Sequence, residues 1–143
     1  MWDPIGLVAA AMLKFRIDLQ ELWSARYGWA DILPKARQYK RKDNDETINR
    51  LLTFKYDRKL KLTEGMCPPE VYGFADGGEL VHGAAISSAD GSHQCVLVIA
   101  KPFVAPLKQR PITRLERLGC VVLTRTYNTC QEVLAFVNFK EYE

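Results

Sequence analysis

The pattern of apolar and polar residues changes at the paired prolines 68–69. Before them, apolar residues between Ile5 and Trp23 recur at the three- to four-residue spacing of a helix. Asp3 can cap this helix, Pro4 suits its first turn, and Gly28 is a stop signal at its far end. The pattern predicts a helical N-terminal segment that is apolar nearly all round in its first half.

A second, shorter helix is expected from the apolar stripe of Ile48, Leu51 and Leu52. Asn44 or Asp45 can serve as its N-cap, because both side chains accept hydrogen bonds from free backbone N–H groups. The charged stretch 55–61 that follows fits either a loop or an edge strand.

After the prolines the pattern becomes that of strands, which we expect at 71–75, 82–87 and 95–100. Asp90-Gly91 tolerates the positive backbone angles of a tight turn, so the second and third strands should form a hairpin. A helix over 112–128 and a fourth strand over 132–139 are predicted to follow. The fold class is therefore α+β, with a helical segment at 1–68 and a sheet domain at 69–143.

The composition is that of a folded protein, since 48% hydrophobic and 26% charged residues exclude wholesale disorder. The 4 cysteines form no CxxC pair and lie at no zinc-finger spacing from His82 or His93, so a structural zinc site is not expected. No secretory signal or membrane span is apparent. An intracellular protein with reduced thiols is the expected class.

A basic run lies at 35–42, in a chain whose formal net charge is +3. Its cations are Lys35, Arg37, Lys40, Arg41 and Lys42, with Tyr39 among them. One interpretation is a nucleic-acid-binding patch, in which the cations contact phosphates beside an aromatic partner. The other is a solvated helix face or a linker, which is the commoner role of such a run.

Two groups of short motifs lie on either side of the prolines. The first group is DPIGL at 3–7, LQELW at 19–23 and GWAD at 28–31. The second group is YGFAD at 72–76, HGAA at 82–85, VAPLK at 104–108 and RLE at 114–116. Together they resemble the polyprotein of BEL/Pao-type LTR retrotransposons, from the end of the reverse transcriptase into the ribonuclease H-like region that is also called a Pao retrotransposon peptidase. Only the basic middle, 35–66, has no clear counterpart.

The resemblance implies a reverse transcriptase end followed by a truncated ribonuclease H-like sheet with one main helix. In such folds, carboxylates hold two Mg²⁺ ions about 4 Å apart, and these ions assist the hydrolysis of RNA. Asp76 matches the first carboxylate and Glu116 the second, whereas spacing alone makes Asp76 a turn residue and Glu116 an exposed helix position. The third is expected at the end of the fourth strand, where Phe139 and Lys140 stand.

Three functional hypotheses follow from these observations. The first is a polyprotein fragment that is inactive alone, because two carboxylates would hold Mg²⁺ weakly. The second is a Mg²⁺-dependent ribonuclease H, or an aspartic-peptidase-type hydrolase, within a longer polyprotein. Against the peptidase, Asp76-Gly77-Gly78 lacks the supporting hydroxyl. The third is a non-catalytic module that binds nucleic acid or another protein.

The partners implied are an RNA–DNA hybrid or other nucleic acid, and the remainder of the polyprotein. No membrane partner is expected. The implied location is the cytoplasm, with the nucleus or virus-like particles as alternatives.

Overall fold

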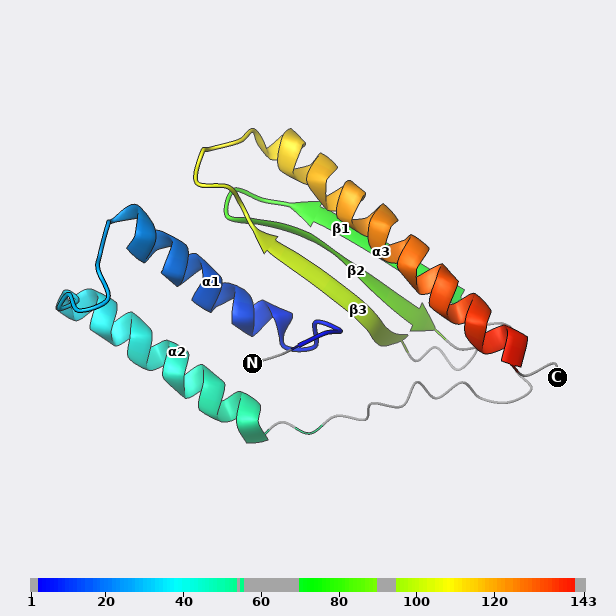
Figure 1. Cartoon of the computed structure of the whole chain (residues 1–143), viewed down its shortest axis with the longest axis horizontal. Helices are drawn as coiled ribbons and strands as arrows, with labels where there is room; N and C mark the ends of the chain where they lie inside the picture. Colours follow the sequence, from blue (N-terminus) through cyan, green and yellow to red (C-terminus); the bar gives the residue numbers. More distant parts are fainter. Residues whose placement is uncertain (1–2, 54, 56–69, 90–94, 141–143) are drawn as a thin grey trace.

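The computed structural model describes residues 3–53, 55, 70–89 and 95–140. These residues form a three-stranded antiparallel sheet with helices on both sides (Figure 1). The elements are α1 (Ala9–Ser24), α2 (Lys35–Thr53), β1 (Glu70–Gly77), β2 (Val81–Ala89), β3 (Cys95–Val104) and α3 (Ile112–Lys140). The α+β class and the three strands predicted after the prolines are confirmed, each strand reaching slightly beyond its expected bounds.

The sheet has the order β1-β2-β3, and both pairings are antiparallel. Asp76 lies opposite Gly83, and Gly77 lies opposite His82, near the turn that joins β1 to β2. At the same end of the sheet, Val81 pairs with the last residue of β3. The end of β1, the start of β2 and the end of β3 therefore lie together at one end of the sheet.

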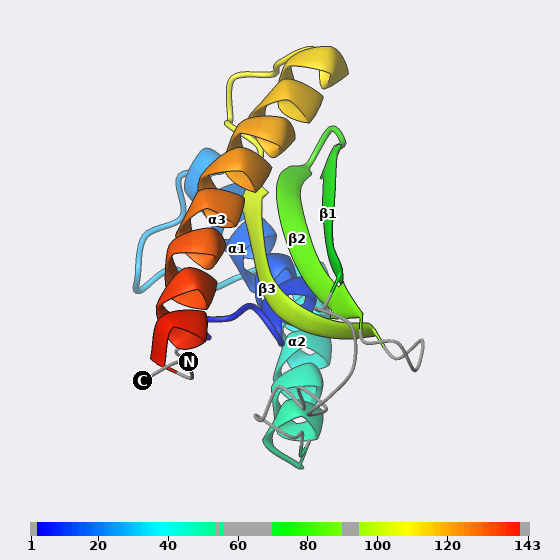
Figure 2. The ribbon, with the colours of Figure 1, turned by 90° about the vertical axis from the view of Figure 1, so that its right-hand side faces the viewer.

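Helix α3 covers one face of the sheet and runs the length of the strands (Figure 2). Leu115, Thr126 and Cys130 are buried on it at helical spacing, and Ile86 of β2 is fully buried in the same core. Burying the apolar side chains of Leu115 and Ile86 stabilises the fold by about 1.5–3 kcal/mol each. The core of the described residues thus lies between α3 and the sheet.

Helix α1 packs against β3 on the side of the sheet away from α3 (Figure 1). An open groove of about 740 Å³ separates it from the middle of the sheet and is lined by residues including Leu13, Phe74 and Leu97. The segment before α1 is tied to β3, because the backbone N–H of Ala100 donates to the carbonyl of Ile5 at 2.8 Å. The predicted helical segment therefore contacts the sheet directly, and the division of the chain at 68–69 stays a prediction.

The first helix begins later than its predicted cap. The Asp3 carboxylate accepts hydrogen bonds from the backbone N–H groups of Gly6, Leu7 and Val8, at 2.9–3.1 Å. It caps a turn that precedes α1, since Gly6 has a φ of 78° and so interrupts the helical path. A side chain at Gly6 would also meet the Ala100 carbonyl oxygen at 2.1 Å, which explains the glycine.

The second helix is present, but its predicted start and its cap at Asn44 or Asp45 are wrong. The basic run and the later apolar stripe form the single helix α2, and Asn44 is buried inside it. Its side chain donates to Asp18 of α1, so the tertiary contact uses the polar group that local reasoning assigned to a cap. The stretch 56–61 lies outside the described residues.

The predicted fourth strand at 132–139 is also wrong, because α3 continues as one helix to Lys140. No glycine or proline interrupts the sequence between 120 and 140, and Cys130 continues the buried stripe of the helix. Within the described residues, no helix is long and apolar enough to cross a membrane.

Candidate functional site

Asp76 lies at the end of β1 and is exposed. Its Oδ1 accepts a hydrogen bond from the backbone N–H of Gly77 at 2.8 Å. In this antiparallel pair, the N–H of Gly78 donates to the carbonyl of Val81 at 2.8 Å, so the N–H of Gly77, one residue earlier, points away from β2. The Asp76 carboxylate therefore lies along the outer edge of β1.

Glu116 is exposed in the first turns of α3, which pass close over the end of β1. A Cβ atom at Gly77 would lie 2.4 Å from the Glu116 nitrogen, and one at Gly119 would lie 2.8 Å from the Asp76 carbonyl oxygen. Real Cβ atoms do not make such contacts, so both positions need glycine. The two glycines bring the backbones of Asp76 and Glu116 together at one end of the sheet.

The two acidic side chains leave this contact in different directions. Gly77 faces α3, and successive residues of a strand point to opposite faces, so the Cβ of Asp76 points away from the α3 side. Glu116 belongs to α3 itself and so lies on the other side of the sheet. A metal ion bridging them would have to sit at the outer edge of β1, and such a bridge stays a prediction.

A two-metal site needs more oxygen ligands than this pair supplies. Within the described residues, no group of three or more His, Cys, Asp or Glu side chains could hold a metal ion. Mg²⁺ usually takes several of its ligands from water or phosphate, so a single ion held by Asp76 and Glu116 stays a prediction. The reasoning that placed Phe139 and Lys140 at the end of a strand is wrong, because they lie in α3, and residues 141–143 lie outside the described part of the chain.

His82 also lies at this end of the sheet, and no sequence motif marks it as a site residue. It lies opposite Gly77, so the two residues share the face toward α3. Its ring stacks on Phe103 with 5.7 Å between centroids, and its buried Nδ1 has no hydrogen-bond partner among the described residues. Alternation along β2 could have placed it on the α3 face, but not beside the acidic pair.

The predicted basic patch is divided by the packing of α2 against α1. Arg37 and Lys40 face α1, where both form ion pairs with Asp18 and Glu21. Hydrogen bonds donated by Arg37 and then Lys40 hold the pKa of Glu21 below its ordinary value. These two cations therefore bind the protein itself.

The other three members of the run, Lys35, Arg41 and Lys42, are exposed. Because residues 37, 40 and 44 recur every three to four positions, they share the face of α2 that meets α1. Lys35 and Lys42 fall outside that stripe. The phosphate-contacting interpretation stays a prediction, and Lys35, Arg41 and Lys42 are the members of the run that form no ion pair among the described residues.

Comparison with known proteins gives one match. The family model described as the Pao retrotransposon-like RNaseH-like domain matches residues 1–143, the whole chain. Comparison with curated proteins and with solved structures finds no match.

Proposed function

Because the chain belongs to the Pao retrotransposon-like RNaseH-like domain family, we propose that it works as a nucleic-acid-binding part of a Pao-type retrotransposon polyprotein. In this proposal, Asp76 and Glu116 supply an incomplete metal site, and the chain alone does not cleave RNA. The partner is an RNA–DNA hybrid or a related nucleic acid. RNaseH-like membership supports nucleic-acid binding in general.

The observation that carries the proposal is the close contact between the start of α3 and the end of β1. Glycine at 77 and at 119 leaves room for the helix backbone to touch the strand backbone. The contact supports the proposal because Asp76 and Glu116, which are distant in sequence, are both exposed and have neighbouring backbones. Two acidic groups at such a place suit a cation that would meet the phosphates of a bound nucleic acid.

A bound Mg²⁺ would polarise a phosphodiester and lower the pKa of a coordinated water molecule. Asp76 would contribute an oxygen from the edge of β1, and Glu116 an oxygen from α3. Close pairs of divalent ions require enough anionic ligands to offset their mutual repulsion. Two carboxylates provide too little negative charge for two ions, which is why we expect no cleavage by this chain.

The test is an assay for cleavage of the RNA strand in a short RNA–DNA hybrid, in Mg²⁺ or Mn²⁺. The wild-type chain should cleave no faster than Asp76→Asn. Binding of Mn²⁺, followed by paramagnetic broadening of NMR signals, should be strongest at Asp76 and Glu116 and weaken in both Asp76→Asn and Glu116→Gln. Broadening that is unchanged by both substitutions would refute the metal site.

The second candidate function is a Mg²⁺-dependent nuclease within a longer polyprotein, and the same contact between α3 and β1 supports it. Cleavage by a longer polyprotein segment that disappears in Asp76→Asn and in Glu116→Gln would favour this candidate. Metal-dependent cleavage by the chain itself, lost in both variants, would contradict inactivity. In either case the acidic pair would be catalytic.

The reverse transcriptase assignment of residues 1–68 is also part of the proposal. Its support is the resemblance of DPIGL, LQELW and GWAD to the family's sequence just past the polymerase palm. The described part of this segment is helical, with α1 and α2 as its two helices.

A further inference from the structure

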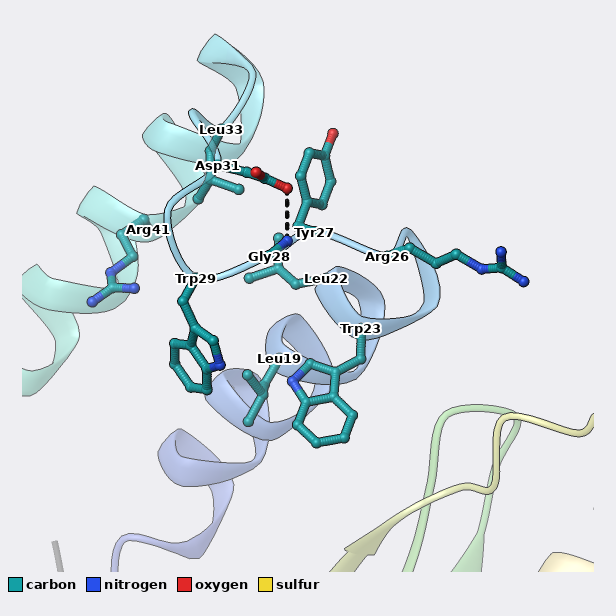
Figure 3. Close-up of a pocket in the computed structure, with 10 residues that line it drawn as sticks. All are labelled: Leu19, Leu22, Trp23, Arg26, Tyr27, Gly28, Trp29, Asp31, Leu33 and Arg41. Atoms are coloured by element: carbon teal, nitrogen blue, oxygen red, sulfur yellow. Dashed lines mark hydrogen bonds between the residues drawn. The ribbon is translucent and has the colours of Figure 1, made fainter.

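An aromatic cleft lies where α1 ends and the chain turns back into α2 (Figure 3). Its volume is about 420 Å³, within the range of roughly 300–1,000 Å³ found for ligand sites. Trp29 is 98% exposed and Trp23 is 68% exposed, although both line the cleft. Two largely exposed tryptophans beside one cavity form a surface that a ligand with flat apolar groups would cover.

The turn that builds the cleft is well defined by hydrogen bonds. The N–H of Tyr27 donates to the carbonyl of Leu22, and that of Arg26 donates to Trp23, which closes α1 with a Schellman motif. Arg26 takes the left-handed conformation of this motif, with a φ of 59°. Asp31 Oδ2 then accepts a hydrogen bond from the N–H of Gly28 at 2.7 Å.

The side chains around the cleft are arranged as a platform between two cations. The indoles of Trp23 and Trp29 lie on either side of Leu19 (Figure 3). The guanidinium groups of Arg26 and Arg41 extend outward on opposite sides of these rings (Figure 3). Asp31 is the acidic residue of the lining, and its carboxylate is engaged by Gly28.

The charge and shape of the cleft select the chemistry of the ligand. Aromatic side chains stack on every nucleobase without regard to sequence, and arginine binds phosphate or stacks on a base. A protein partner would fill the apolar surface but would not require a cation on each side. An unpaired nucleic acid strand supplies both flat bases and regularly spaced anions.

We propose that this cleft binds single-stranded nucleic acid, with bases stacked on Trp23 and Trp29 and phosphates held by Arg26 and Arg41. This proposal rests on the proposed nucleic-acid-binding function and adds a second site, which does not include Asp76 or Glu116. Its failure and the failure of the proposed acidic site are therefore separate results.

The experiment measures fluorescence anisotropy of a labelled oligothymidylate of about ten nucleotides with the full chain, a length within known single-strand site sizes. Trp29→Ala should weaken binding by roughly tenfold or more, the effect of losing one stacked base. Trp29→Phe should retain most of the affinity. Tyr127→Ala is the control and should leave binding unchanged, because Tyr127 is 39% exposed on α3 and does not line the cleft.

The cations have their own matched pair. Arg41 and Lys42 are adjacent and exposed on α2, and Arg41 is the one that lines the cleft. Arg41→Gln should weaken binding more than Lys42→Gln, and equal losses would overturn the site by indicating general attraction to a basic surface. Arg26→Gly should also weaken binding while the fold is kept, because glycine is the usual residue in this turn conformation.

An abasic oligonucleotide of the same length separates stacking from charge. It carries the same phosphates without bases, so it should bind roughly tenfold more weakly or worse. Equal binding of the two oligonucleotides would overturn the proposal. Self-association that depends on Trp29, without oligonucleotide binding, would assign the cleft to a protein contact and would overturn it as well.

Discussion

Replacing Asp18 by alanine should loosen the packing of α1 against α2. Asp18 is 8% exposed on α1, and Asn44 is 4% exposed on α2. Asn44 Nδ2 donates to Asp18 Oδ2 at 3.4 Å. The other carboxylate oxygen accepts no well-aligned hydrogen bond among the described residues, but Lys40 Nζ lies 3.3 Å from it and Arg37 Nη1 lies 3.5 Å from it.

The loss of stability in Asp18→Ala comes mainly from the Asn44 amide, which loses its hydrogen-bond acceptor. A buried donor that loses its partner costs about 1–3 kcal/mol in unfolding free energy. The ion pair with Lys40 adds about 0–1 kcal/mol, because the Lys40 side chain is 41% exposed and water screens the attraction. We therefore expect Asp18→Ala to lower the unfolding free energy by about 2 kcal/mol and Tm by roughly 5–10 °C.

The assay is thermal and urea unfolding of the full chain, followed by far-UV circular dichroism. Asp18→Asn is the matched variant, because its amide oxygen can still accept from Asn44 while the charge is removed. It should destabilise the chain by less than half as much as Asp18→Ala. Equal losses of stability in the two variants would show that the charge of Asp18, rather than its hydrogen bond with the Asn44 amide, dominates the contact. No loss in either variant would refute this account of how α1 and α2 are held together.

Two further predictions concern acid stability and the contact of α3 with β1. The hydrogen bond from Arg37 lowers the pKa of Glu21 from its ordinary value of 4.5. The stability that Glu21 contributes is therefore complete above pH 4.5 and is lost as pH falls through the lowered pKa. The Tm difference between wild type and Glu21→Gln should shrink below pH 4.5. Gly77→Ala should destabilise the chain by about 1–3 kcal/mol in urea unfolding, because the new Cβ would lie 2.4 Å from the Glu116 nitrogen. Gly78→Ala, whose Cβ would meet only the Val81 carbonyl at 3.9 Å, is the control, and equal effects would contradict the close contact.

The strands could be predicted from the sequence because their signals are local. Short runs of β-branched and aromatic residues, with Asp76-Gly77-Gly78 between the first two, mark where chain direction reverses. The start of α3 could also be predicted, since Pro111 precedes Ile112 and apolar residues then recur at helical spacing. These features need no knowledge of what each element packs against.

The lengths of α2 and α3 could not be predicted, because tertiary contacts decide them. Local reasoning assigned Asn44 to a cap, but its amide is buried against Asp18. The β-branched and aromatic residues after Asn128 favour a strand by propensity, yet the buried stripe of α3 continues through Cys130. The prediction of a fourth strand is wrong for this reason, and the expected position of a third carboxylate at the end of that strand is wrong with it.

Whether Asp76 and Glu116 form a site stays a prediction, but the contact between their backbones is a feature of the fold. Asp76 and Glu116 were chosen by resemblance, and no local pattern indicates that Gly77 and Gly119 let their backbones touch. The aromatic cleft was not predicted, because the local pattern around Trp23 and Trp29 indicates only the end of a helix, and the LQELW and GWAD motifs that contain them show a resemblance but no site. Exposure identifies them, and exposure is a property of the fold.

The two candidate sites lie toward the same end of the molecule. Gln20 of α1 donates to the carbonyl of Ala105 at 2.8 Å, and the N–H of Ala105 donates to Leu80 in the turn between β1 and β2. The end of α1, which carries Trp23, is therefore joined through two hydrogen bonds to the turn that follows Asp76. The end of α1 and the start of α3 also lie toward the same side of the molecule (Figure 1). A nucleic acid strand that contacts both sites would therefore have to run from the end of α1, along this end of the sheet, to the outer edge of β1.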